Sequence, residues 1–179
     1  MVALLCVAGI AVAVYKGKSK VEDVVAASKI SVVEPETLGG RKKASDPSLQ
    51  ASVQSLDSEM KNIQGSTSSV GAIYGDLAKK DVVMVAAAST LIGTAQSRYD
   101  EFASGLDSGG FSTNALKDTE PGPLGGIAKC GDSSVSGVPT AICVWSDQGS
   151  VGMVMMLFKK KADLEKEFVT LRGQVEKKA

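Results

Sequence analysis

Cys130 and Cys143 are the residues whose spacing points most directly to a specific chemistry. They flank a hairpin if residues 136–137 form its two-residue turn. Counting outward from that turn, Val135 faces Val138 and Cys130 faces Cys143, at a non-hydrogen-bonded pair where Cα atoms approach to about 4.5 Å. A disulfide can span that distance, so the register predicts a Cys130–Cys143 bond.

The alternative is a pair of buried free cysteines, which behave as small apolar side chains. We expect no metal site, because the chain has three cysteines, no histidine and no second cysteine pair. The C-x-x-C spacing of redox proteins is also absent. If the disulfide forms, the domain is expected to lie outside the cytoplasm, where thiols are not kept reduced.

The residues needed for catalysis are missing or lack their usual context. Without histidine the chain lacks the commonest general base. Residues 58–61 match S-x-x-K, in which a lysine activates a serine, but the partner motifs S-D-N and K-T-G are absent. The 20 basic and 20 acidic residues leave a net charge of zero, which argues against nucleic-acid binding. We therefore expect a protein that is not an enzyme, with no cofactor and no nucleic-acid partner.

The strands that carry the cysteines are apolar on both faces. A turn at Gln148-Gly149 places Trp145 opposite Gly152 and Cys143 opposite Val154. One face then carries Ile142, Val144, Val151, Met153, Met155 and Leu157, and the other carries Cys130, Cys143, Trp145, Val154, Met156 and Phe158. Such strands are covered by helices on both sides, or by helices on one side and a partner on the other.

A methionine-rich surface can adapt to different ligands. The candidate ligand or partner surface therefore comprises Trp145, Met153, Met155 and Met156. The alternative is that these side chains fill the core.

The remaining elements predict an α+β fold. Asp46 and Pro47 open a helix with an apolar stripe that continues through Ile63. Two strands then follow, at 70–74 and 82–88, and after them a helix at 91–103 and a weak strand at 111–116. The C-terminal part adds three strands, at 127–133, 138–146 and 151–158, and a helix from about residue 162. We expect residues 46–179 to form one antiparallel sheet of about five or six strands with two or three packed helices.

The N-terminus has a different character. Residues 1–15 are almost wholly apolar but fall short of the roughly 20 residues that span a bilayer. We expect a transmembrane anchor whose first residues lie upstream of Met1, followed by a linker at 16–45 with a short strand near Ile30. A cleaved signal peptide, an N-terminal core strand and a lipoprotein cysteine at Cys6 are the alternatives. Lysines at 16, 18 and 20 favour a cytoplasmic domain, which opposes the disulfide argument.

A resemblance bears on this conflict. Its motifs are Leu38-Gly39-Gly40, Tyr74-Gly75-Asp76, and the segments 121–126, 129–131, 138–147 and 149–152. In these motifs the chain resembles actinobacterial single-pass membrane-anchored extracytoplasmic proteins of unassigned function, over about residues 35–178. The resemblance implies one transmembrane helix, an external domain and bridged cysteines, and it implies no activity. The chain departs from that pattern at its start, which lacks the usual cytoplasmic segment.

Two functions follow as expectations. The first is a cell-membrane protein whose extracytoplasmic domain is a non-enzymatic interaction or sensor module, with the membrane and an envelope protein or lipid as partners. The alternative is a binding domain for a lipid or small apolar ligand, which requires a pocket between sheet and helix. A hydrolase ranks third, because it would need two distant carboxylates to meet across a cleft.

Overall fold

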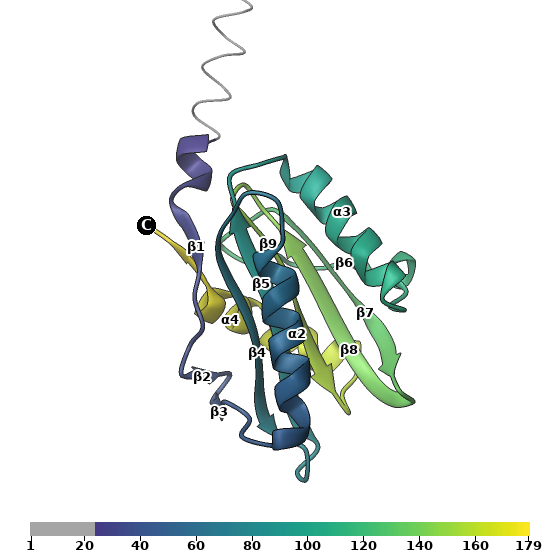
Figure 1. Cartoon of the computed structure of the whole chain (residues 1–179). Coiled ribbons are helices and arrows are strands. Elements are labelled where there is room, and N and C mark those ends of the chain that lie inside the picture. Colours follow the sequence, from purple (N-terminus) through teal and green to yellow (C-terminus); the bar gives the residue numbers. More distant parts are fainter. Residues whose placement is uncertain (1–23) are drawn as a thin grey trace, which may run out of the picture.

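The computed structural model describes residues 24–179, and the predicted anchor at 1–15 lies outside them. Six antiparallel strands form the main sheet (Figure 1). Their spatial order is β4 (Ser66–Asp76), β5 (Asp81–Thr90), β9 (Ser150–Leu157), β8 (Val138–Ser146), β7 (Ile127–Val135) and β6 (Lys117–Asp118). The predicted α+β class with an antiparallel sheet of about six strands is confirmed. None of the described helices is long and apolar enough to cross a bilayer.

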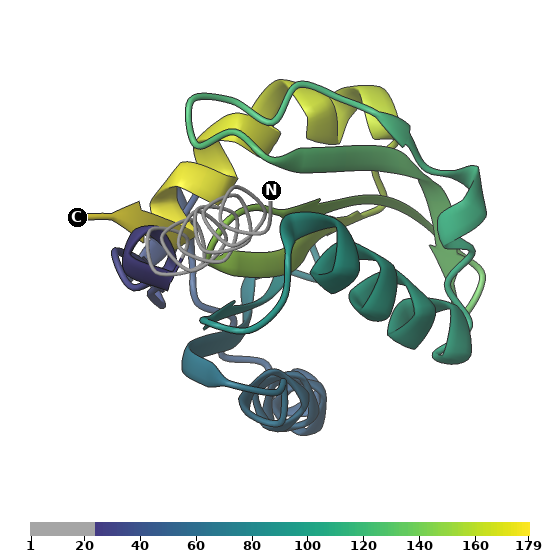
Figure 2. The same ribbon diagram turned by 90° about the horizontal axis from the view of Figure 1, so that it is seen from above.

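Three helices cover the two faces of the sheet. Viewed from above, α4 (Lys161–Val175) lies on one face, while α2 (Gln50–Lys61) and α3 (Ala95–Ser108) lie on the other (Figure 2). The stripe of α4 formed by Leu164, Phe168 and Leu171 is buried against the sheet. Helices therefore pack on both faces of β8 and β9.

The predicted registers are confirmed. Cys130 pairs with Cys143 and Trp145 pairs with Gly152. The β7–β8 turn falls at Ser136-Gly137, where both residues have positive φ. The two faces also separate as expected, because Val154 packs on the α4 side while Met153 packs on the α2–α3 side.

Two segments differ from their predicted form. The second helix begins at Ala95 instead of residue 91, because the Thr94 side chain accepts a hydrogen bond from the Ser97 N–H and caps it there. Leu91 therefore lies in an exposed turn. Residues 111–116 hold a short 3₁₀ turn, η2 (Thr113–Ala115), and the strand β6 follows it.

The segment before α2 is held by local hydrogen bonds and by two short pairs of antiparallel strands outside the main sheet. Asp46 accepts hydrogen bonds from the N–H and hydroxyl of Ser48, which starts a 3₁₀ turn, η1 (Pro47–Leu49), before α2. The strand expected near Ile30 is β1 (Ile30–Val32), and it pairs with β10 (Glu176–Lys178) outside the main sheet. A short hairpin of β2 (Thr37–Leu38) and β3 (Arg41–Lys42) links β1 to η1.

Two glycines permit close packing. At Gly71 in β4 a Cβ would lie 2.3 Å from the backbone nitrogen of Asp57, so the α2 backbone lies directly on the strand. At Gly152 a Cβ would lie 2.7 Å from carbons of the Trp145 ring and 2.6 Å from the Cβ of Ala87. The indole thus occupies the space that any side chain at position 152 would need.

We predict that Gly152→Ala lowers the free energy of unfolding by about 1–3 kcal/mol, because the added methyl overpacks a closed core. Urea unfolding followed by Trp145 fluorescence measures the loss. Gly173→Ala in α4 is the matched control, since nothing lies within 4 Å of its added Cβ, and alanine is the better helix former. Equal stabilities of the two variants would contradict the packing argument.

Candidate functional site

A groove of about 750 Å³ lies between α2, α3 and the sheet, partly open to solvent. Leu56 and Met60 of α2 form one wall, and Phe102 and Leu106 of α3 form the other. The lining is predominantly apolar along most of its length. This volume falls in the range of about 300–1,000 Å³ that is typical of small-molecule sites.

The floor of the groove is rich in methionine. Met84 of β5 pairs directly with Met155 of β9, and Met153 of β9 lies on the same face, paired with Ala86. Val151 continues the floor towards the start of β9. Flexible, polarisable thioether side chains give this surface an adaptable shape.

One end of the groove is polar. Asn62 and Gln64, just after α2, lie there with Arg98 of α3. The Arg98 side chain donates to the carbonyls of Ile92 (2.8 Å) and Gly93 (2.9 Å) through Nη1. Its Nη2 donates to the Asp147 carbonyl, whereas its buried Nε has no hydrogen-bond partner within residues 24–179. Burial lowers the pKa of Arg98, since the charged form is poorly solvated there.

The four residues predicted as a ligand or partner surface do not lie together. Met153 and Met155 are on the groove floor. Trp145 and Met156 face α4 on the opposite side of the sheet and are fully enclosed. Trp145 Nε1 donates to the Ser150 hydroxyl at 3.1 Å, so this indole is satisfied within the core.

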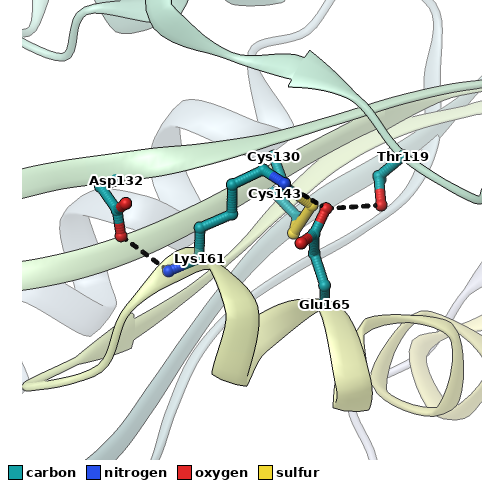
Figure 3. Close-up of a disulfide and its surroundings, with 6 residues drawn as sticks. All are labelled: Thr119, Cys130, Asp132, Cys143, Lys161 and Glu165. Atoms are coloured by element: carbon teal, nitrogen blue, oxygen red, sulfur yellow. Dashed lines mark hydrogen bonds and ion pairs between the residues drawn. A yellow bond between two sulfur atoms is a disulfide. The ribbon is translucent and has the colours of Figure 1, made fainter.

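The cysteines form a disulfide between β7 and β8 on the α4 side of the sheet (Figure 3). Their Cα atoms are 4.1 Å apart, close to the short spacing that the register predicted. Around the bridge, the Lys161 N–H donates to Asp132 at 2.7 Å, and Glu165 accepts from Lys161 Nζ and from the Thr119 hydroxyl. These bonds hold the start of α4 over the disulfide.

A buried ionic cluster lies at the end of α4, and sequence reasoning missed it. Arg172 is 0 % exposed, Glu176 2 % and Asp147 4 %. Arg172 donates from Nε to Glu176 and from Nη2 to Asp147, both at 3.0 Å. Ser150 donates its hydroxyl to Glu176 at 2.9 Å. No motif marks this cluster, and an arginine and a glutamate four residues apart are typical of a solvated helix face.

The two carboxylates of this cluster titrate differently. Burial, followed by the hydrogen bond with Asp147, raises the pKa of Glu176 to about 7. Burial alone would raise the pKa of Asp147, but hydrogen bonds from Glu176, the Gly149 N–H and the Ser150 N–H, together with the Arg172 charge, lower it. Below about pH 7 the pair therefore holds one proton, and that proton lies on Glu176.

We expect stability to fall as pH rises from about 4.5, the ordinary pKa of Glu176, to about 7. In this window the folded state retains a proton on Glu176 that the unfolded chain has lost, so raising pH favours unfolding. The total loss should be on the order of a few kcal/mol. Urea unfolding at pH 5, 6, 7 and 8 measures it. Glu176→Gln should flatten the profile above pH 5, and an unchanged slope in this variant would contradict the assignment.

Residues 24–179 contain no group of three or more histidine, cysteine, aspartate or glutamate side chains arranged to hold a metal ion. No known family model matches the chain, and comparisons with curated proteins and with solved structures give no significant match.

Proposed function

We propose that this protein is a binding domain for a lipid or another apolar small molecule, held in the groove between α2 and α3. The observation that carries the proposal is an unfilled apolar groove of about 750 Å³ above a methionine floor. Protein interiors are otherwise closely packed, and apolar hollows of this size on a small domain mark binding sites. On the opposite face of the sheet, Leu164, Phe168 and Leu171 of α4 pack into the core.

This proposal advances the second of the functions expected from sequence. A flat, filled sheet would have favoured a protein-interaction module, whereas an apolar pocket between sheet and helix favours ligand binding. A sensor role is compatible with the groove, since the protein would then detect its ligand by binding it there.

The direct test is displacement of the fluorescent apolar probe N-phenylnaphthylamine by dodecanol. Ser55 lines the groove, so Ser55→Trp should fill it and weaken probe binding about tenfold or more. Ser58→Trp on the same helix is the matched control, because Ser58 is exposed and does not line the groove. Circular dichroism checks that both variants fold. Absence of probe binding to the unmodified protein, or equal binding by the two variants, would overturn the proposal.

We also propose that the domain lies outside the cytoplasm, attached to a membrane through its N-terminal segment. The Cys130–Cys143 bridge supports this placement, because structural disulfides persist in oxidising compartments. Non-reducing peptide mass spectrometry tests it on native membranes whose free thiols are blocked before lysis. A linked peptide supports the external location, and two blocked, reduced cysteines would reject it.

A further inference from the structure

We propose that the ligand is a single-chain amphiphile with an anionic headgroup, which lies beside Arg98 while its apolar chain covers the methionine floor. This inference rests on the proposed function and adds the chemical class of the ligand. It comes from the charge at one end of the groove, whereas the proposed function comes from the groove's volume and apolar lining.

Arg98 differs from the other two arginines of the chain in its partners. Arg41 pairs with Asp81 and Glu167. Arg172 pairs with Asp147 and Glu176. Arg98 is 6 % exposed, yet within the described part of the chain it forms no ion pair and bonds only to backbone carbonyls. A buried cation without a hydrogen-bonded counter-ion is costly, so an anion at this point would be favoured.

The Asp147 carboxylate acts on Arg98 through its charge alone, without a hydrogen bond or an ion pair. Asp147 offers Arg98 its backbone carbonyl, and its carboxylate accepts instead from Arg172 and from the Gly149 and Ser150 N–H groups. The groove lining includes Glu59 and Glu101, but both are exposed and neither pairs with Arg98.

The Nε of Arg98 is enclosed by protein, while other atoms of the same side chain line the groove. It is the one buried side-chain donor among residues 24–179 that lacks a hydrogen-bond partner. Native structures rarely leave such a donor unsatisfied. The start of α3 adds partial positive charge at the same end.

On the α3 side the groove changes from polar at Arg98 to apolar at Leu106 and Phe111, whereas Ser52 and Ser55 of α2 line the same far end. Residues 52–60 of the lining extend for about 12 Å along α2 at the helical rise per residue, and residues 62–64 continue the groove beyond the end of the helix. A charged head followed by a medium-length acyl chain matches this gradient. Guanidinium binds carboxylate and phosphate alike, so a fatty acid and a phosphorylated lipid share the required chemistry.

The test compares four probes with the same chain: laurate, dodecyl phosphate, dodecanol and dodecyltrimethylammonium. Each displaces N-phenylnaphthylamine from the unmodified protein below its micelle concentration. We expect at least one anion to bind about tenfold or more tightly than dodecanol, and the cation to bind more weakly than dodecanol. The order of laurate and dodecyl phosphate then distinguishes a fatty acid from a phosphorylated lipid.

The outcomes separate this inference from the proposed function. Equal binding of the anions and dodecanol would overturn the anionic headgroup and leave the apolar groove standing. Binding of none of the four would overturn both.

Variants at Arg98 test whether its charge causes the preference for anionic probes over dodecanol. Arg98→Gln should reduce the anion-to-alcohol ratio to about twofold or less, and Arg98→Lys should retain part of it. Arg41→Gln is the control, since Arg41 is bound elsewhere by Asp81 and Glu167 and should leave the ratio unchanged. A full preference in folded Arg98→Gln would contradict the assignment. If that variant does not fold, the comparison of the four probes on the unmodified protein still decides the question.

Discussion

Arg172→Met is expected to destabilise the domain by about 3–5 kcal/mol, because it removes the one cation paired with two buried carboxylates. The guanidinium also donates to the carbonyls of Pro121 (3.0 Å) and Gly125 (2.8 Å), so the loop at 121–126 would lose its attachment to α4. Methionine keeps much of the side-chain volume, which isolates the electrostatic loss from a cavity effect. Thermal and urea unfolding at pH 8, above the pKa of about 7 of Glu176, measure the loss.

Lys61→Met provides the matched control. It also removes a cation from an i,i+4 helical ion pair, but Lys61 and Asp57 are solvent-accessible. Such pairs contribute at most about 1 kcal/mol. Adding Glu176→Gln and Asp147→Asn to Arg172→Met should recover part of the lost stability, since neutral amides need no counter-charge. A loss in Arg172→Met no larger than the control would show that the buried cluster is not an energetic unit.

Replacing both cysteines with alanine is expected to lower the free energy of unfolding by about 3 kcal/mol. The bridge closes a loop with a sequence separation of 13, and its removal restores conformational freedom to the unfolded chain. The hairpin register should survive, since its turn and the surrounding ladder do not depend on the sulfurs. Urea unfolding of the double variant, with and without reductant, measures the effect.

The unmodified protein supplies the control for this experiment. With reductant present throughout unfolding, it should lose about as much stability as the double variant, whereas the double variant should be insensitive to reductant. A double variant as stable as the bridged protein would mean that the disulfide contributes nothing to the fold.

The pairing of strands could be predicted residue by residue where a two-residue turn and the alternation of side chains between the two faces determine the register. A turn at Ser136-Gly137 places Cys130 opposite Cys143, and a turn at Gln148-Gly149 places Trp145 opposite Gly152 in the same way. Two apolar faces could also be read from the strands, because side chains alternate with a period of two.

The groove could not be predicted, because it depends on the spacing between helices that are not adjacent in the chain. The sequence places Met153 and Met155 on one face, but it does not show that α2 and α3 leave that face partly uncovered. The burial of Arg98 could not be predicted either, since the backbone carbonyls that it binds, at residues 92, 93 and 147, come from turns. The Arg172 cluster joins α4 to the β8–β9 turn, a contact that no local pattern records.

The burial of the disulfide has a kinetic consequence. Both cysteines are fully enclosed beneath α4, and thiol–disulfide exchange requires an attacking thiolate to reach a sulfur atom. A reductant in solution can therefore act only when the domain opens, and the rate of reduction cannot exceed the opening rate. Under strongly reducing, non-denaturing conditions, the lifetime of the bridge therefore sets an upper limit on how long the structure around it stays closed.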